Sequence, residues 1–185
     1  MASTCGKEEA VNYALKVVGK ENFALKRQQL EILQLITIEK KDVLAVLPTG
    51  FGKSLIYQII APFSEFMSCG QEPTVGETNS IVLVISPLNA LIRDQVTKLR
   101  ASKLKACILK ADRVALDGED RDREEVDVSS SEPLENLKNF QLIFAHPEAV
   151  VKNKRVIKVL KTAEFQSRLK AIVVDEAHLV VDWYV

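Results

Sequence analysis

A glycine-bearing loop is followed at once by a lysine and a serine, two side chains that can hold the phosphates of a nucleotide. The segment comprises Pro48, Thr49, Gly50, Phe51, Gly52, Lys53 and Ser54. Without a Cβ at its glycines, such a loop can point backbone N–H groups at an anion, and the dipole of a following helix adds to the attraction. Lys53 would reach the β- and γ-phosphates, and Ser54 would take a place on Mg²⁺.

The strict phosphate-loop pattern has a glycine six positions before the lysine, where this chain has Leu47. A plain loop between a strand and a helix is therefore the alternative for this segment taken alone. A second motif near the C-terminal end makes phosphate binding the stronger hypothesis. It is the tetrapeptide Asp175, Glu176, Ala177 and His178.

Two adjacent carboxylates in this tetrapeptide directly follow an apolar run, residues 171–174. A carboxylate at the end of a buried strand can hold Mg²⁺ through water, opposite Ser54. Its neighbour points in another direction and can polarise a water for in-line attack on a γ-phosphate. An acidic loop at a strand end is the plain alternative, and it loses weight once the tetrapeptide is taken together with the phosphate loop.

Apolar segments that alternate along the chain must position these groups. Strands are predicted at 43–47, 80–86, 105–110, 140–145 and 171–174, and helices at 8–18, 25–38, 53–67, 88–100 and 153–168. Pro62 is expected to bend or end the regular part of the third helix. This alternation predicts an α/β fold with a parallel sheet covered on both faces, and ligands beyond the carboxyl ends of its strands.

The remaining segments are predicted from their polar composition. Residues 69–79 and the acidic stretch 112–135 are expected to be exposed loops. The lysines of 153–168 favour a solvated helix face over a track for DNA. Gln29 lies on or beside an apolar stripe, where spacing favours a partly buried amide satisfied by backbone over one that recognises a base edge.

Composition limits the class of protein. The 185 residues carry 25 basic and 25 acidic side chains, so the global charge does not indicate nucleic acid. Three widely spaced cysteines, Cys5, Cys69 and Cys107, lack metal-ligand spacing and are expected to be reduced thiols. The N-terminus has no apolar signal core and no apolar run is long enough to cross a membrane. We therefore expect a soluble nuclear or cytoplasmic protein.

Together, the motifs resemble those of superfamily 2 helicases of the DEAH type and, more narrowly, the RecQ-like DNA helicases. The resemblance covers about residues 8–183. It implies an N-terminal helix and lead-in at 1–24 and a first RecA-like, P-loop NTPase domain at 25–185. It also implies the cofactors ATP and Mg²⁺, with Lys53, Asp175, Glu176 and His178 as catalytic residues.

Further site residues are implied by the same resemblance. Gln29 would contact adenine. The segment 85–96 is similar to a motif that lies along single-stranded DNA, and Ala145-His-Pro-Glu148 resembles a second such motif, with histidine in place of serine. The DNA-binding residues implied are Ser86, Pro87, Asn89, Arg93, Gln95, His146, Pro147, Glu148 and Trp183.

The function implied is that of the N-terminal half of an ATP-dependent 3′–5′ DNA helicase, acting on single-stranded or forked DNA. Such enzymes close a second RecA-like domain over the nucleotide, and we expect the chain to be a fragment that needs it for hydrolysis. A non-catalytic nucleotide- or DNA-binding module is the alternative. A P-loop ATPase unrelated to nucleic acid is disfavoured, because five segments match in order.

Overall fold

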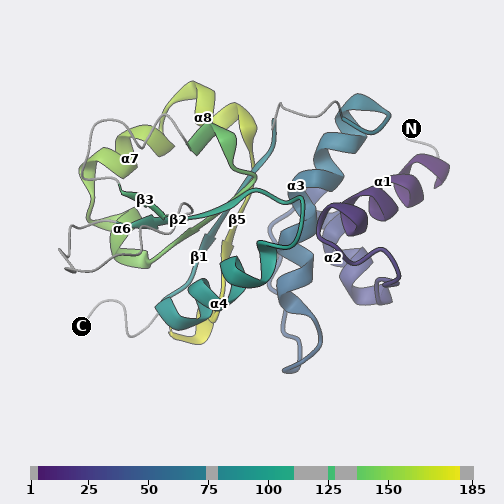
Figure 1. Cartoon of the computed structure of the whole chain (residues 1–185), viewed down its shortest axis with the longest axis horizontal. Helices are drawn as coiled ribbons and strands as arrows, with labels where there is room; N and C mark the ends of the chain where they lie inside the picture. The colour runs from purple at the N-terminus through teal and green to yellow at the C-terminus, as the bar shows by residue number, and fades with distance from the viewer. Residues whose placement is uncertain (1–3, 74–78, 111–124, 128–136, 180–185) are drawn as a thin grey trace.

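The computed structural model describes residues 4–73, 79–110, 125–127 and 137–179. Within these ranges a five-stranded sheet lies between two layers of helices (Figure 1). The strands are β1 (Ile81–Ile85), β2 (Ala106–Lys110), β3 (Glu125–Asp127), β4 (Leu142–Ala145) and β5 (Leu169–Val174). The helices are α1 (Thr4–Val17), α2 (Arg27–Thr37), α3 (Lys53–Cys69), α4 (Asn89–Leu99), the 3₁₀ helix η1 (Leu137–Asn139), α6 (Pro147–Val151), α7 (Lys154–Leu160) and α8 (Ala163–Arg168).

The strands run in the order β3-β2-β4-β1-β5, and the neighbouring pairs are parallel. β1 lies between β4 and β5 and has the sequence Ile-Val-Leu-Val-Ile. Its branched side chains suit a pleated strand that is buried on both faces. Val82 and Val84 face one core, and Ile81 and Leu83 face the other. The predicted α/β fold with a parallel sheet is confirmed.

One face of the sheet is covered by α3 and α4, and α1 and α2 pack on the outer side of α3. α3 is buried over most of its length, from Leu55 to Phe66. Pro62 does not end it, because the helix continues to Cys69 and closes on Gly70 in the left-handed conformation. Of the two outcomes expected for Pro62, a bend or an end of the helix, the end is therefore wrong.

The other face is covered by α7 and α8, whose Val156 and Phe165 pack against the strands. The single helix predicted at 153–168 is wrong, since it breaks where Thr162 accepts a hydrogen bond from the Phe165 amide and begins a new helix. The lysines of α7 are exposed, as predicted. α6 was not predicted; it starts with Pro147 in its first turn, a favoured place for proline.

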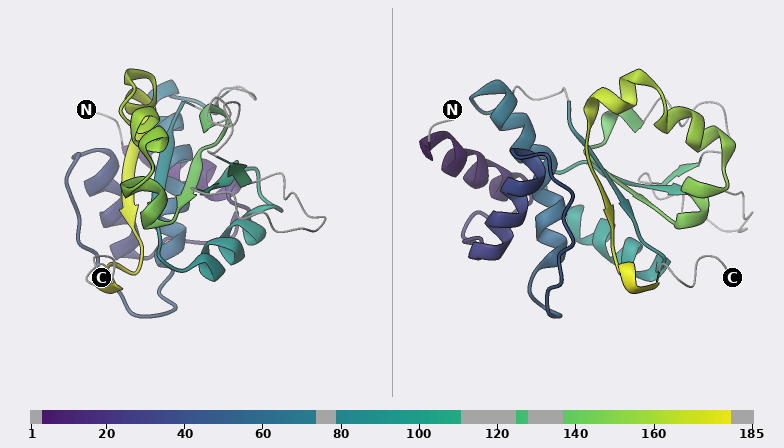
Figure 2. Two further views of the ribbon diagram at one scale, coloured as in Figure 1. Left: turned by 90° about the vertical axis from the view of Figure 1, so that its left-hand side faces the viewer. Right: turned by 180° about the vertical axis from the view of Figure 1, so that it is seen from behind.

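The most consequential departure concerns residues 43–47, which were predicted as a buried strand. In the structure they form no strand, and Leu44 and Val46 are 85% and 88% exposed. The segment passes beside β5 without pairing with it, as the view from behind in Figure 2 shows. An apolar run forms a strand only where a neighbouring strand supplies backbone hydrogen bonds. Among the described residues, no strand pairs with residues 43–47.

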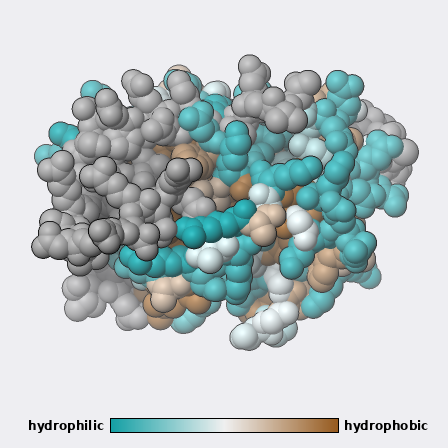
Figure 3. Space-filling view, in the orientation of Figure 1, coloured by the Kyte–Doolittle hydropathy of each residue, from teal (hydrophilic) through white to brown (hydrophobic). Residues whose placement is uncertain are grey.

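The other expectations concern the polarity of the surface, the polar loops, the cysteines and membrane spans. On the face shown in Figure 3, the side chains over α1 and α3 are largely hydrophilic, with scattered apolar patches. The predicted loop 112–135 lies outside the described residues except for β3, a short strand where a loop was expected. Cys69 and Cys107 are free thiols. Among the described residues, no helix is long and apolar enough to span a membrane.

Candidate nucleotide-binding site

The phosphate loop turns through two glycines in the left-handed region, Gly50 at φ +75° and Gly52 at φ +94°. The Phe51 amide donates to the Pro48 carbonyl across this turn. Gly52 then stands directly before α3, so Lys53 and Ser54 begin the helix as predicted. The loop therefore ends at a helix N-terminus, where unpaired backbone N–H groups and the helix dipole favour an anion.

Gln29, in α2, holds this loop from below and is fully buried. Its side-chain amide donates to the carbonyls of Phe51 and Gly52, each at 3.2 Å, and its carbonyl accepts from the Lys26 amide at 2.9 Å. Lys26 adds a cation–π contact, with its ammonium 4.1 Å from the centre of the Phe51 ring. The interpretation of Gln29 as a buried amide satisfied by backbone is thus confirmed. Its contact with adenine stays a prediction.

The second motif forms a tight turn at the end of β5. Asp175 pairs with the sheet through its amide, which donates to the Ile85 carbonyl. The Glu176 amide donates to the Asp175 carboxylate at 3.1 Å, and Glu176 has a left-handed φ of +52°, uncommon for a residue other than glycine. His178 lies 3.4 Å from the Glu176 carboxylate. The two carboxylates thus have different neighbours, the Glu176 amide for Asp175 and His178 for Glu176. That they divide the work at a nucleotide between them stays a prediction.

The two motifs, far apart in the sequence, meet along one groove of about 760 Å³. Lys53, from the start of α3, and Asp175, Glu176 and His178, from the end of β5, all line it. Burial raises the pKa of Asp175, while the nearby Lys53 ammonium and the backbone hydrogen bond from Glu176 act in the opposite direction. Lys53 also donates to the Leu47 carbonyl at 3.5 Å.

Tyr57 is a member of this site that the sequence analysis missed. It lies one helical turn after Ser54 in α3, is 4% exposed, and packs edge-on against Phe144. Burial raises its pKa, and the side chains of Ser54 and Asp175 also act on it. Its buried hydroxyl nevertheless completes no hydrogen bond with any described residue. The only signal in the sequence was its spacing from Ser54.

The chemistry of the groove fits a nucleotide with a hard cation. Ser54, Asp175 and Glu176 supply oxygen donors, the ligand type that Mg²⁺ prefers. The orphaned Tyr57 hydroxyl beside them is a further polar group without a partner among the described residues. Among the described residues, no three Asp, Glu, His or Cys side chains are arranged so that they could hold a metal ion by themselves. Mg²⁺ commonly binds through one or two carboxylates together with phosphates and water.

The ends of the other strands bring further predicted residues to the same edge of the sheet. Ser86 follows β1 and is buried, and its hydroxyl has no partner among the described residues. Asn89 and Arg93 are exposed on α4, Pro87 is half-buried, and Gln95 accepts a hydrogen bond from Gln58 in α3 at 3.0 Å.

At the end of β4, His146 takes the position that begins α6, and its Nδ1 accepts from the Glu148 amide at 3.4 Å. Nδ1 therefore acts as an acceptor, as a serine hydroxyl would at a helix start. Pro147 is buried, and Glu148 is exposed and paired with Lys152, which lowers the pKa of Glu148. Trp183 lies outside the described residues.

A parallel α/β sheet with a glycine loop, a lysine and a strand-end carboxylate at one edge defines a RecA-like nucleotide-binding domain. The sequence pattern of the DEAD/DEAH box helicases matches residues 26–185, and the chain belongs to that family.

Comparison with individual proteins agrees with this assignment to the helicase family. The chain is 34% identical over 167 residues to the ATP-dependent DNA helicase hus2/rqh1 of Schizosaccharomyces pombe, covering 89% of this chain and 11% of that protein. It is 32% identical over 162 residues to the ATP-dependent DNA helicase Q-like 4B of Arabidopsis thaliana, covering 88% and 12%. It is 30% identical over 162 residues to the ATP-dependent DNA helicase Q1 of Rattus norvegicus, covering 85% and 22%. These relatives are RecQ-like helicases, which confirms the resemblance; the chain spans at most about a fifth of their length.

Proposed function

We propose that this chain is the N-terminal, ATP-binding half of an ATP-dependent 3′–5′ DNA helicase. It binds Mg-ATP and single-stranded or forked DNA, and a second RecA-like domain of the whole protein completes hydrolysis. The observation that carries the proposal is that Lys53 and Asp175 line one groove, where the ammonium of Lys53 acts electrostatically on the carboxyl of Asp175. The relatives, named as ATP-dependent DNA helicases, support the same activity.

The phosphates of ATP would lie over the loop that Gly50 and Gly52 form. Lys53, now on the Leu47 carbonyl, would exchange this weak contact for the β- and γ-phosphates. A charge-assisted bond of this kind is shorter and stronger than a bond to a neutral carbonyl. Gln29 keeps the loop in shape, and a contact with adenine that pairs a donor with an acceptor would require it to free an N–H group now bonded to Phe51 or Gly52.

Mg²⁺ would lie between Ser54 and Asp175, bound to Asp175 through water, and would neutralise charge on the phosphates. Glu176 would polarise the attacking water. Its contact with His178 holds the carboxylate in place and keeps it apart from Asp175. The proposed division of work between the two acids follows from their different neighbours at the end of β5.

DNA would run along the ends of β1 and β4, over Asn89 and Arg93 of α4 and the start of α6. The exposure of both α4 side chains supports a contact with phosphates and sugars, which carries little sequence preference. His146 keeps its Nδ1 occupied by the Glu148 amide, so its other ring nitrogen is the atom that would face a nucleic acid. We propose a nuclear or cytoplasmic location for the protein.

The chain alone would bind Mg-ATP weakly and hydrolyse it slowly. Related phosphoryl-transfer enzymes gain about 10³–10⁵ in rate from an arginine supplied across the cleft. In the proposed enzyme that arginine belongs to the second RecA-like domain. A non-catalytic module that binds nucleotide or DNA without turnover is the second candidate, because binding needs only the groups described above.

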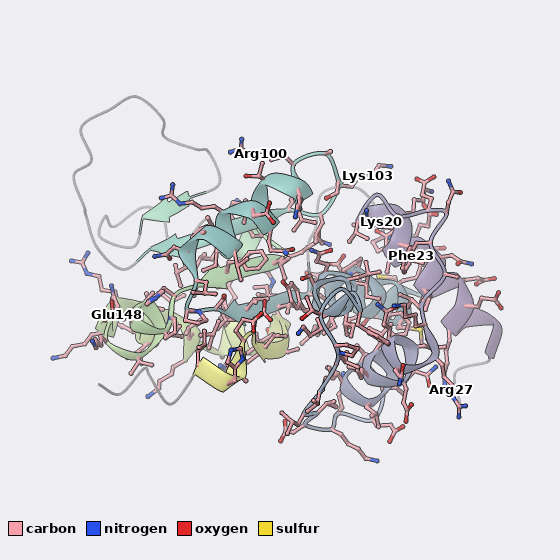
Figure 4. The ribbon with its side chains drawn as sticks, turned by 90° about the horizontal axis from the view of Figure 1, so that it is seen from below. Lys20, Phe23, Arg27, Arg100, Lys103 and Glu148 are labelled. Atoms are coloured by element: carbon pink, nitrogen blue, oxygen red, sulfur yellow. The ribbon has the colours of Figure 1, made fainter. Side chains whose placement is uncertain are left out.

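The test is calorimetric titration of the purified chain with ATP in Mg²⁺. Lys53→Ala is expected to weaken binding by about 10-fold or more, since it removes a charged partner of the phosphates. Lys20→Ala is the matched control: Lys20 is exposed at the end of α1, on the side away from α6 and Glu148 (Figure 4). Equal affinity for the two variants contradicts the proposed nucleotide site.

DNA binding and turnover are tested separately. Arg93→Ala is expected to weaken binding of labelled single-stranded DNA and to reduce the salt dependence of its affinity, because a phosphate contact is lost. A steady ATPase rate of about 1 s⁻¹ from the chain alone, stimulated by DNA, contradicts the need for a second domain. A longer form of the protein that binds ATP and DNA but never hydrolyses ATP favours the non-catalytic module.

A further inference from the structure

The Tyr57 hydroxyl is buried near Ser54 and Asp175, the two residues of the proposed cation site, and it has no hydrogen-bond partner among the described residues. It belongs to α3, which also carries Ser54, and it lies close to Asp175 at the end of β5. A buried polar atom without a hydrogen bond is unusual in a folded protein, because its lost hydration is uncompensated. We therefore expect the Tyr57 hydroxyl to form a hydrogen bond when the site is occupied.

We infer that Tyr57 is a positioning residue for the cation: its hydroxyl donates a hydrogen bond to the Asp175 carboxylate and orients that carboxylate toward Mg²⁺ bound with the nucleotide. The inference rests on the proposed function and adds to it a residue that acts through Asp175. Tyr57 does not touch the nucleotide or the cation.

The surroundings of Tyr57 suit this role. Its ring is fixed edge-on against Phe144, with ring centres 6.1 Å apart, so the hydroxyl is held at one place in the groove. Burial and the neighbouring carboxylates raise the pKa of Tyr57, which keeps its proton in place for donation.

The nature of the donor matters. Asp175 already accepts a hydrogen bond from the Glu176 amide on its Oδ1. A donor from α3 would hold the carboxylate from the opposite direction, so that its rotation is restricted on both sides. Groups that orient a metal ligand in this way commonly change metal affinity by about 10–100-fold when removed.

The experiment measures the affinity of the full chain for ATP at a series of Mg²⁺ concentrations and in EDTA, for the wild type and Tyr57→Phe. The variant is expected to need about 10-fold more Mg²⁺ for the same gain in affinity. Its affinity in EDTA should not change. Its thermal unfolding temperature without nucleotide should be equal or higher, because phenylalanine removes only an unpaired hydroxyl. Titration with Mn²⁺, followed by electron paramagnetic resonance, reports the bound cation directly.

Tyr13→Phe is the control, since Tyr13 packs on Phe66 near the other end of α3. An unchanged Mg²⁺ dependence in Tyr57→Phe overturns the inference, and so does a lower unfolding temperature with no effect on the cation. If the wild type binds ATP and Lys53→Ala does not, such a result leaves the proposed function intact. If the wild type shows no Mg²⁺-dependent binding, both fall.

Discussion

The side-chain amide of Gln29 lies against the backbone of Gly52, and a Cβ added at Gly52 would stand 2.7 Å from its nitrogen. The amide donates to the carbonyl of the same glycine. Gln29 of α2 and Gly52 of the phosphate loop, 23 positions apart in the sequence, are thus fitted closely to each other at a position whose φ also favours glycine.

Gly52→Ala is expected to damage the phosphate loop. The new methyl group would meet Gln29, and φ +94° is a conformation that alanine rarely adopts. We expect a loss of about 1–3 kcal/mol in the free energy of unfolding and loss of ATP binding. Gly19→Ala is the control, because Gly19 also has a positive φ but no atom within 4 Å of an added Cβ. A Gly52→Ala chain that binds ATP normally would show that this fit is unimportant.

Gln29→Ala distinguishes a residue that shapes the loop from one that reads a base. Loss of its hydrogen bonds should cost about 1–3 kcal/mol of stability, because buried backbone carbonyls lose partners. If Gln29 acts through the loop, the affinities for ATP, inosine triphosphate and inorganic tripolyphosphate should fall by similar factors. If it recognises adenine, only the affinity for ATP should fall. Competition titrations with the three ligands give the answer.

Charged substitutions at Leu44 and Val46 test the absence of a strand at 43–47. Both side chains are more than four-fifths exposed, so Leu44→Lys and Val46→Lys should each change the free energy of unfolding by less than about 0.5 kcal/mol. Val84→Lys, in the buried centre of β1, is the comparison and should unfold the domain. Urea denaturation measures all three. A loss of several kcal/mol at position 44 would restore the original prediction of a buried strand.

Glu65, which does not line the nucleotide groove, is expected to make the free energy of unfolding depend on pH. Burial raises the pKa of this carboxyl, while hydrogen bonds from Gln141, Ser80 and Asn79 act in the opposite direction. Between the ordinary and the raised pKa, the folded state binds more protons than the unfolded state. The contribution of Glu65 to stability is therefore largest at low pH and falls as pH rises through the raised pKa.

The measurement is the difference in free energy of unfolding between wild type and Glu65→Gln as a function of pH. The wild type should lose stability relative to the variant from about pH 4 upward, until Glu65 is fully ionised. Tyr13 and Arg168 also interact with Glu65 electrostatically. A difference that stays constant with pH would mean that the pKa of Glu65 is not raised.

Much of the fold could be predicted from the sequence because its signals were local. The run Ile81–Ile85 is branched, apolar and bounded by serines, so a buried strand was the expected outcome. The start of α3 followed from Gly52 and the residues after it. The break between α7 and α8 had a local signal too, the capping side chain of Thr162, which the apolar spacing of the longer segment outweighed.

The wrong strand at 43–47 and the missed Tyr57 both depend on contacts between distant segments, which a local sequence pattern does not contain. Residues 43–47 have the composition of a strand, but a strand also needs a neighbour, and the identity of that neighbour is not written in the segment itself. Tyr57 was taken as part of an apolar helix, and its place beside Asp175 depends on how α3 crosses β5. Lys53 and Asp175 were predicted to meet because the carboxyl ends of parallel strands share one edge. The two residues do line one groove, but residues 43–47 are not a strand, and Lys53 reaches the groove as the first residue of α3.

β5 forms one border of the sheet in the described residues, with Ile172 and Val174 respectively 58% and 42% exposed. A border of this kind, whose one charged residue is Lys170 near its start, can pair with another polypeptide along its apolar remainder. We expect concentrated solutions of the chain to form intermolecular β-structure, visible as thioflavin fluorescence, before they lose their helices. A lysine in place of Ile172 should act as a gatekeeper and raise the concentration that the protein tolerates.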